Sequence, residues 1–543
     1  MPSSAGPGWY RRLESRLGQH ADIVAAALVG LGFCWRLWLA HATFFNTDEA
    51  WHYSVANQNS LAEAYKASLS LAHPPLMILV LYFWKHLGAS DVMIRLPGVI
   101  AGSVFCWAFY KWLAFLFGRT GPWCGLVFAA FLPPMIVLSA ELRQYSWLLL
   151  FSCLALYLLE RSLAQDSTRV MWLSSLCLWL AMLSHYSAFL VAASLGIYAM
   201  LRFTLERHHS RVIAAWAVGQ AVGVGLAAFL YRTHVSKLAA VYPGDPLRRF
   251  GDFYLSDVYF HAGKESLLHF LYRGTFGVFR FICAQRTAGH LTTILFLAGI
   301  FLLWRQKNDA TRRLAPARWP ALLLVLPFML NWMAVVAGLY PYGRTRQCAF
   351  LAIFGIAGIS VTLATLTRYR TALAVVLAGV IIATCHLFGT PHSLDLLAVA
   401  EQRHEHMERA VEFIRKEVSP GDVLFTDMPT SFQLMHYLCG PKPVEVETSE
   451  SGLNSFACSG SRVISTALAD GSLTPQTFPL KLRQMEQSAG VISPTTVWVV
   501  QGAWSSGLGE ALRVQSQQFA GIEPHMFDRY LEVFRLPPLE AAP

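Results

Sequence analysis

The chain has 543 residues, of which 55% are hydrophobic and only 14% are charged. Soluble domains carry roughly 25% charged residues, so this composition excludes an ordinary soluble protein and predicts a polytopic membrane protein. A net charge of +10 would suggest a nucleic-acid partner in a soluble chain. Here, however, the Lys and Arg residues lie in short segments between apolar runs, where they determine topology, so we expect membrane lipids and no nucleic acid as partners.

Apolar runs of the length that crosses a bilayer dominate the first 388 residues. After a short N-terminal segment, residues 1–20, the first run is too long for a signal-peptide core, so we interpret it as a retained span. We therefore predict an all-α polytopic membrane bundle over residues 21–388, with about eleven transmembrane helices. The predicted spans cover residues 21–43, 97–117, 122–140, 142–159, 170–184, 186–202, 212–231, 290–304, 319–338, 348–366 and 371–388.

Positive charge sets the predicted orientation. The basic segments, among them "WYRRLESR", "GRTG" and "WRQKNDATRRLAPAR", all fall on one face, which we expect to be cytoplasmic together with the N-terminus. The stretch "AHPPLMILVLYFWKHLGASD" has an apolar core of only about twelve residues, which is short for a crossing. Counting it as a crossing would also move a basic segment outside. We therefore place it along the outer surface, within an external loop of residues 44–96.

Polar side chains gather where this topology places the outer ends of the spans. The segment "FFNTDEAWHYSV" puts Asp48, Glu49 and His52 directly after the first span. Ionisable groups at a membrane are costly and usually mark function. The other members of this outer set are His73, Lys85 and Arg95 around the interfacial helix, Glu141, Arg143 and Tyr145 in "SAELRQYSW", His185 and Tyr186 in "LSHYSAF", and Tyr340, Tyr342, Arg344 and Arg346 in "GLYPYGRTRQ".

Each of these groups also has a structural interpretation. An acid after a span is commonly a solvated loop residue, and His185 alone is more typical of a hydrogen-bonded histidine at a helix end. Arg344 and Arg346 could anchor the chain at the membrane surface, and Lys85 could be a snorkelling anchor. The combination of these groups on one face favours a site.

Two regions outside the spans are expected to be ordered. In the loop of residues 232–289, "SLLHFLYRGTFGVFRFI" predicts an interfacial helix, which could cover an acceptor or act as a structural strut. Residues 389–543 are more polar and predict a small external α/β domain. Its elements are a helix in "LLAVAEQRHEHMERAVEFIRKEV", strands in "VLFTD", "TTVWVVQG" and "YLEVFRLP", and a helix in "GLGEALRVQSQQF". Cys439 and Cys458 are the two cysteines that could pair, and the role of His436 is open.

Six motifs in order give the chain a family resemblance. "TDEA", "HPPL", "RLPG", "ELRQY", "SHY" and "YPYGRTRQ" make roughly residues 20–390 resemble the GT-C membrane glycosyltransferases. More narrowly, the chain is similar to protein O-mannosyltransferases and bacterial lipid A aminoarabinose transferases. The resemblance implies an inverting transfer of a sugar from a polyprenyl-phosphate-linked donor to an acceptor at the outer face. A glycolipid, lipid A, a polysaccharide or a protein would fit as the acceptor.

The resemblance also implies roles for the residues. Asp48 matches the acid of the family's first external loop and is expected to be the catalytic base, and Glu141 stands at the second acid. Arg344 and Arg346 are expected to bind the donor phosphate, because guanidinium groups bind phosphate bidentately. His73 and Lys85 could also reach the donor. After the second arginine of this motif, many relatives have His or Tyr, whereas this chain has Gln347. Acceptor-contacting or supporting roles are expected for Glu49, His52, Arg143, Tyr145, His185, Tyr186 and Tyr342.

Cofactor, alternative function and location complete the expectations. No cofactor is required, although Asp48 and Glu141 could hold a divalent cation, as acids do in the oligosaccharyltransferases of the superfamily. The alternative is a secondary transporter, but that would favour polar groups near the bilayer midplane and an internal repeat. The sequence shows neither. Without an organellar targeting signal, we expect a bacterial inner-membrane protein with a periplasmic C-terminal domain.

Overall fold

The computed structural model describes residues 19–118, 120–237, 255–306, 318–389, 402–448, 453–458, 460–465, 496–502, 512–513, 523–528 and 531–536. The chain divides into two compact units. The bundle unit comprises Met1–Trp38, Ser68–Met77 and Arg95–Leu396, and the sheet unit comprises Leu39–Ala67, Ile78–Ile94 and Leu397–Pro543. Most of the predicted external loop therefore packs with the C-terminal residues.

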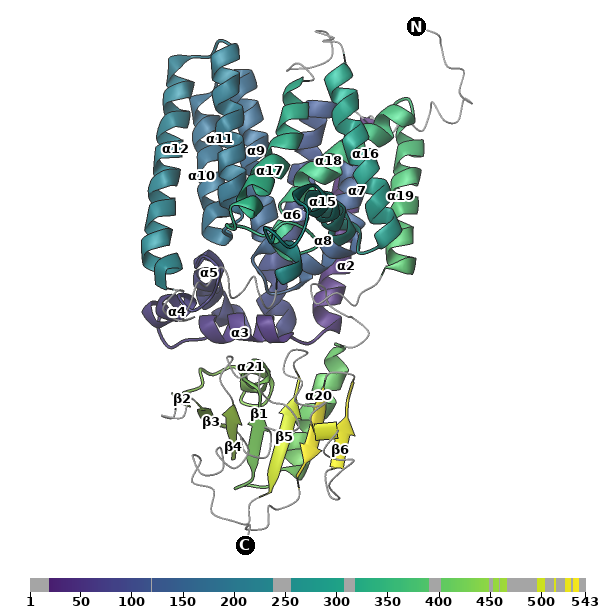
Figure 1. Ribbon diagram of the computed structural model, residues 1–543. Coiled ribbons are helices and arrows are strands. Elements are labelled where there is room, and N and C mark those ends of the chain that lie inside the picture. Colours follow the sequence, from purple (N-terminus) through teal and green to yellow (C-terminus); the bar gives the residue numbers. More distant parts are fainter. Residues whose placement is uncertain are drawn as a thin grey trace. The chain divides into compact units, whose positions relative to one another are not determined.

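Long apolar helices form the bundle unit (Figure 1). Among the described residues, eight helices are long and apolar enough to cross a membrane, or nine if the bent pair α7 (Gly121–Phe131) and α8 (Pro133–Ala140) forms one span. The eight are α2 (Ala21–Ala42), α6 (Asp91–Phe117), α9 (Tyr145–Gln165), α11 (Ala188–Leu205), α12 (Ser210–Leu230, with an extension to Val235), α16 (Arg286–Arg305), α17 (Arg318–Val336) and α19 (Thr371–Phe388).

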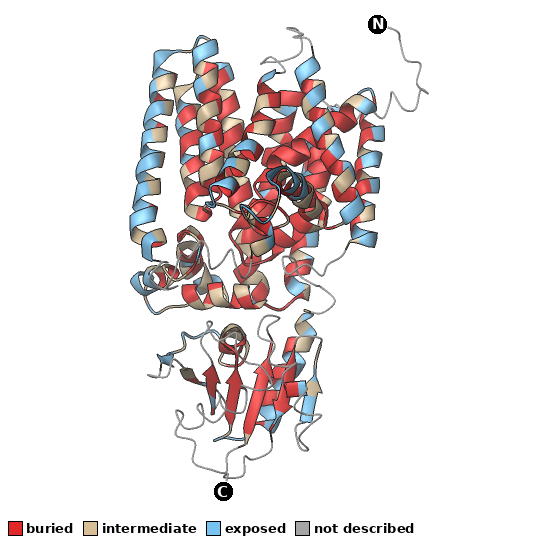
Figure 2. Cartoon of the chain, in the orientation of Figure 1, coloured by how far each residue is buried: buried red, intermediate tan, exposed pale blue. Residues whose placement is uncertain are grey.

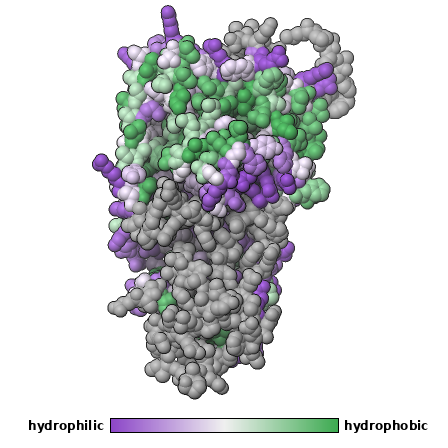
Figure 3. All heavy atoms as spheres, in the orientation of Figure 1, coloured by the Kyte–Doolittle hydropathy of each residue, from purple (hydrophilic) through white to green (hydrophobic). Residues whose placement is uncertain are grey.

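Two shorter apolar helices, α10 (Thr168–Ser184) and α18 (Leu351–Leu366), coincide with the remaining predicted spans. The predicted helical membrane bundle is thus confirmed, and the count of eleven crossings stays a prediction. Burial differs sharply between the helices. Only 22% of the apolar stretch of α12 is buried inside the protein, whereas 61% of the apolar stretch of α6 is buried (Figure 2). On the face drawn in Figure 3, hydrophobic side chains cover much of the helical bundle, as expected for an integral membrane protein.

The bend between α7 and α8 has a local cause. We predicted a single span over residues 122–140, but the two helices meet at 54° because Pro133 and Pro134 lack the N–H groups that would bond to the carbonyls of Ala129 and Ala130. The fully buried Arg36 donates instead to these two oxygens, at 2.8 and 2.9 Å. Its guanidinium thus satisfies the carbonyls that the bend releases.

The segment between α12 and α16 contains the helix predicted there. Helix α15 (Leu267–Cys283) follows the short turn η3 (Ser256–Val258), and residues 238–254 of the predicted loop lie outside the described residues. α15 packs against α8, α16 and α18. Its location at a membrane interface stays a prediction.

The sheet unit contains a seven-stranded sheet of order β2-β3-β4-β1-β5-β7-β6 among the described residues. The central strand β1 (Val423–Thr426) is parallel to β4 (Ser461–Ser465) and β5 (Val497–Gln501), and β5 pairs with β7 (Glu532–Arg535) in antiparallel orientation. The edge strands are β2 (Glu447–Thr448) and β6 (Glu523–Met526), and β3 (Asn454–Cys458) lies between β2 and β4. β1, β5 and β7 lie in the three predicted strand segments.

The remaining elements of the sheet unit are helices. α20 (His404–Glu417) confirms a predicted helix, although most of "GLGEALRVQSQQF" lies outside the described residues. Helix α21 (Met428–Tyr437) and strands β3 and β4 were not predicted. A disulfide joins Cys439 to Cys458, the two cysteines whose pairing the sequence left open. From the external loop come α3 (Thr47–Ala56), α4 (Leu61–Ser68) and α5 (Leu76–Trp84), which runs into the turn η1 (Lys85–Leu87).

Candidate functional site

A buried ion pair joins two distant segments of the bundle unit. Glu141 directly follows α8, and Arg346 begins the short helix η4 (Arg346–Cys348). Oε2 of Glu141 lies 3.7 Å from Nη1 of Arg346, and the two side chains are only 2% and 6% exposed. A buried charge is costly unless an opposite charge compensates it. The structure thus brings together the two motifs "ELRQY" and "YPYGRTRQ".

Aromatic and imidazole rings gather beside Arg143. Nη2 of Arg143 lies 3.5 Å from Nε2 of His73, and the ring of His73 stacks on that of His185 with centroids 5.3 Å apart. The ring of Tyr145 lies 5.1 Å from His185, and the Arg143 guanidinium lies 5.8 Å from Tyr145. Four of the predicted site residues therefore form one cluster.

His185 is held neutral in this cluster. Burial, together with the positive charge of Arg143, lowers the pKa of His185 to about 3. Its Nδ1 accepts a hydrogen bond from the backbone N–H of Ser187 at 3.1 Å, so the single proton of the neutral ring resides on Nε2. At neutral pH His185 can donate a hydrogen bond, but it adds no charge to the site.

We expect His185 to reduce the stability of the protein as the pH falls below about 6.5. The unfolded chain binds a proton near the ordinary pKa of about 6.5, whereas the folded chain resists protonation down to about pH 3. The linked loss in free energy of unfolding is about 2 kcal/mol at pH 5, and no loss occurs above the unfolded pKa. In detergent, His185→Asn should show a smaller drop in melting temperature between about pH 7.5 and pH 5 than wild type. Equal drops would contradict the assignment.

A histidine that we did not predict anchors the segment bearing His73. His234, at the end of α12, is 1% exposed. Its Nε2 donates to the carbonyl oxygen of Leu71 at 2.9 Å, and its Nδ1 accepts from the hydroxyl of Tyr186. Tyr186 thus supports the cluster through His234. The sequence signal was a histidine just beyond the predicted span of residues 212–231, and only the tertiary fold reveals its partner.

Helix α15 holds the loop that carries Arg344 and Arg346. The backbone N–H of Tyr342 donates to the carbonyl of Val258 at 2.8 Å, and the Tyr342 hydroxyl lies 2.8 Å from that of Thr275. Tyr342 is fully buried, whereas Arg344 is half-buried. Gly343 has a φ of +148°, which only glycine adopts readily. The loop is therefore rigidly supported just before its two arginines.

The other predicted site residues lie in the sheet unit. Asp48 is half-buried in the first turn of α3, where the helix N-terminus stabilises negative charge. Its carbonyl oxygen accepts from Nδ1 of His52 at 2.6 Å. Glu49 is buried and completes a capping box with Asn46. Lys85 donates to the carbonyl of Gln58 at 2.7 Å, which ties η1 to the segment after α3.

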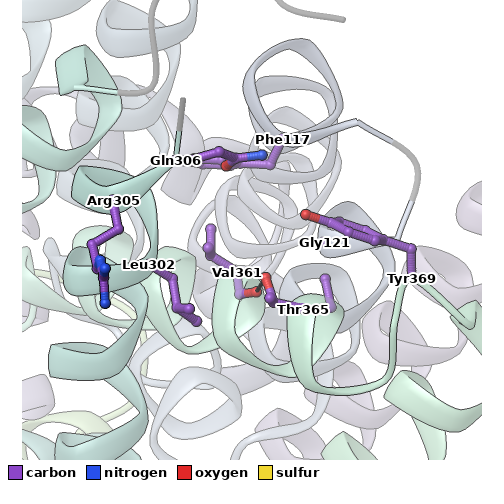
Figure 4. Close-up of a pocket in the computed structure, with 9 residues that line it drawn as sticks. Phe117, Gly121, Leu302, Arg305, Gln306, Val361, Thr365 and Tyr369 are labelled. Carbon is purple, nitrogen blue, oxygen red and sulfur yellow. Dashed lines mark hydrogen bonds between the residues drawn. The ribbon is translucent and has the colours of Figure 1, made fainter. Parts of the chain in front are cut away.

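A cavity of about 300 Å³ lies where α6 ends and α7 begins (Figure 4). It is lined by the last residue of α6, Phe117, and the first residue of α7, Gly121, together with Arg305 and Tyr369. Glu141 instead follows the far end of the α7–α8 pair, and Arg346 precedes α18, whereas Tyr369 follows it. This cavity is therefore not part of the Glu141–Arg346 site.

Among the described residues, no group of three or more His, Cys, Asp or Glu side chains is placed to hold a metal ion. Asp48 and Glu141, the acids that could hold a cation, belong to different units.

Comparisons with known proteins agree with the fold. Residues 72–231 match the model of the dolichyl-phosphate-mannose-protein mannosyltransferase family. The structure is similar to that of ArnT from Cupriavidus metallidurans, with 12% identity and a TM-score of 0.53 over 95% of this chain and 98% of that chain. The Archaeoglobus fulgidus oligosaccharyltransferase complex with Zn and sulfate matches with 11% identity and a TM-score of 0.51, over 92% of this chain and 72% of that chain.

No curated protein matches the chain by sequence. The family model over residues 72–231 and the ArnT-like fold nevertheless confirm the resemblance to GT-C membrane glycosyltransferases.

Proposed function

We propose that this protein is an inverting glycosyltransferase that takes a sugar from a polyprenyl-phosphate-linked donor. The observation that carries the proposal is the buried Glu141–Arg346 pair beside a half-buried second arginine, Arg344. The family model, whose members are named for a dolichyl-phosphate-linked donor, supports the same donor class. The acceptor would be a glycolipid such as lipid A, a polysaccharide or a protein, at the outer face of a bacterial inner membrane.

Positive charge explains how these residues would serve the leaving group. Arg143, Arg344 and Arg346 contribute three guanidinium groups from two motifs of the bundle unit, and Glu141 pairs with Arg346. Guanidinium groups bind phosphate oxygens in a bidentate manner and stay charged near lipid. Charge that develops on the phosphate as the sugar leaves would be stabilised by this preorganised cationic group.

The two acids are proposed to have different roles. Glu141 is buried and paired with Arg346, so its carboxylate orients a guanidinium. Asp48 is half-buried at a helix start, and we assign it as the base that takes the proton from the acceptor hydroxyl. Attack on the anomeric carbon forms the new glycosidic bond as the bond to phosphate breaks, with inversion at that carbon. The proton moves to Asp48, and the electron pair leaves with the phosphate.

Asp48→Asn should reduce sugar transfer at least 100-fold, because a positioned base contributes about 10²- to 10⁴-fold. The measurement is transfer of radiolabelled sugar from polyprenyl-phosphate donors to a panel of lipid, glycan and protein acceptors in membranes. Asp22→Asn is the matched control, since Asp22 pairs with Lys111 at the first turn of α2. No transfer by wild type with any donor would overturn the proposed function. Full activity of Asp48→Asn would overturn only the assignment of the base.

A further inference from the structure

Two side chains of helix α21 form hydrogen bonds with the backbone N–H and carbonyl groups of Phe45. This residue lies just before α3, the helix that carries Asp48. The backbone N–H of Phe45 donates to the hydroxyl of Tyr437 at 2.6 Å, and Nε2 of Gln433 donates to the carbonyl oxygen of Phe45 at 2.9 Å. Gln433 and Tyr437 are four residues apart, so they lie on the same face of α21. All three residues belong to the sheet unit.

Fixing Phe45 fixes the start of α3. The next residue, Asn46, is the N-cap: its Oδ1 accepts from the N–H of Glu49, and its own N–H donates to Glu49 Oε2, each at 3.0 Å. Asp48 lies within this capped turn. Helix α3 also packs along α21, with the rings of Trp51 and Phe432 stacked 5.9 Å apart. Any shift of α21 would therefore move the carboxylate of Asp48.

The same face of α21 holds the other end of the external segment. The Tyr437 hydroxyl, which accepts from Phe45, donates its own proton to Oδ2 of Asp91, and Nε2 of His436 lies 2.8 Å from Oδ1 of Asp91. Nδ1 of His404 lies 3.4 Å from Oδ2 of Asp91. One helix thus closes the chain between residues 45 and 91 at its base.

Helix α21 is itself firmly attached to the sheet. Near its start, the hydroxyl of Thr430 accepts from the backbone N–H of Gly502, which directly follows β5, at 2.9 Å. Two residues after its last turn, Cys439 forms the disulfide to Cys458 at the end of β3. Both ends of α21 are therefore restrained, which makes it a suitable reference for the position of α3.

We propose that Gln433 and Tyr437 are positioning residues for Asp48. In this proposal the C-terminal domain serves catalysis because α21 holds α3, the helix that carries Asp48. This inference rests on the proposed role of Asp48 as the base. Because small misplacements of a catalytic group can cost up to about 100-fold in rate, the positioning should affect kcat. Donor binding, which we assign to arginines of the bundle unit, should be unaffected.

Tyr437→Phe and Gln433→Leu test the proposal in the full-length protein. Each should lower kcat about tenfold or more and leave the donor KM within twofold of wild type. Hydrogen exchange of residues 44–56, measured by mass spectrometry on the folded protein, should become faster. Thr426→Val is the matched control: it removes a buried hydroxyl that donates to the carbonyl of Val500 at 2.7 Å, within the sheet. Its kcat and its exchange over residues 44–56 should equal those of wild type.

Several outcomes separate this inference from the proposed function. Unchanged kcat in both α21 variants, with wild type active, would overturn the positioning role and leave the function standing. An equal loss of kcat in Thr426→Val would also overturn it, because the loss would then reflect stability. The exchange measurement needs no activity: unchanged exchange in Tyr437→Phe would overturn the inference even if no donor were found.

Discussion

Glu141→Gln is expected to lower the free energy of unfolding by about 3 kcal/mol and to reduce sugar transfer severely. The substitution preserves shape but leaves the guanidinium of Arg346, which is 6% exposed, without the carboxylate that lies 3.7 Å away. Removal of one partner of a buried pair typically costs 3–5 kcal/mol, because the remaining charge loses an opposite charge at close range. Thermal unfolding in detergent and the transfer assay measure the two effects separately.

The double variant Glu141→Gln/Arg346→Gln separates the structural role from the functional one. The double variant buries neither the carboxylate nor the guanidinium of this pair, so we expect at least half of the lost stability to return. Transfer should not return, because Arg346 is proposed to bind the donor phosphate. If Glu141→Gln unfolds at the same temperature as wild type, the pair is not energetically coupled. If the double variant regains activity, Arg346 is not a phosphate ligand.

The helices of the bundle were predictable because burial in lipid demands long apolar segments, and hydrophobicity along the chain records this demand directly. α9, α16 and α19 lie close to their predicted positions for this reason. The bend between α7 and α8 was indicated by Pro133 and Pro134. Its satisfaction by Arg36, which is almost a hundred residues away in sequence, depends on tertiary contacts that no local pattern records.

Prediction was weaker in the sheet unit, where segments are short and only partly buried. Strand β3 has only five residues, and the first two are both half-buried, so it gives little periodic signal. Helix α21 did carry a local signal, an N-cap Asp427 followed by Pro429 in the first turn. The partners of Asp91 and Phe45, by contrast, come from residues more than 300 positions away, so their pairing follows only from the fold.

The loop that carries Arg344 and Arg346 offers a second test of the proposed donor site, because it contacts α15. Gly274 and Gly277 lie three residues apart and both face the segment "YPYGR". A methyl group on Gly277 would lie 2.9 Å from the backbone nitrogen of Arg344, and one on Gly274 would lie 2.6 Å from the ring of Tyr342. Real side chains do not approach this closely, and backbone atoms cannot rotate away as a flexible side chain can. The absence of both side chains therefore lets α15 contact the loop.

Gly277→Ala should therefore displace the loop at Arg344 and raise the donor KM about tenfold, because the phosphate-binding guanidinium groups move away from their preorganised positions. Overpacking of this kind costs about 1–3 kcal/mol of stability. Gly225→Ala on α12 is the matched control: it makes the same substitution where no atom lies within 4 Å of the new methyl group, and alanine is the better helix former by about 1 kcal/mol. The control should unfold at or above the wild-type temperature, with an unchanged donor KM. A donor KM in Gly277→Ala equal to that of Gly225→Ala would show that the position of Arg344 does not determine donor binding.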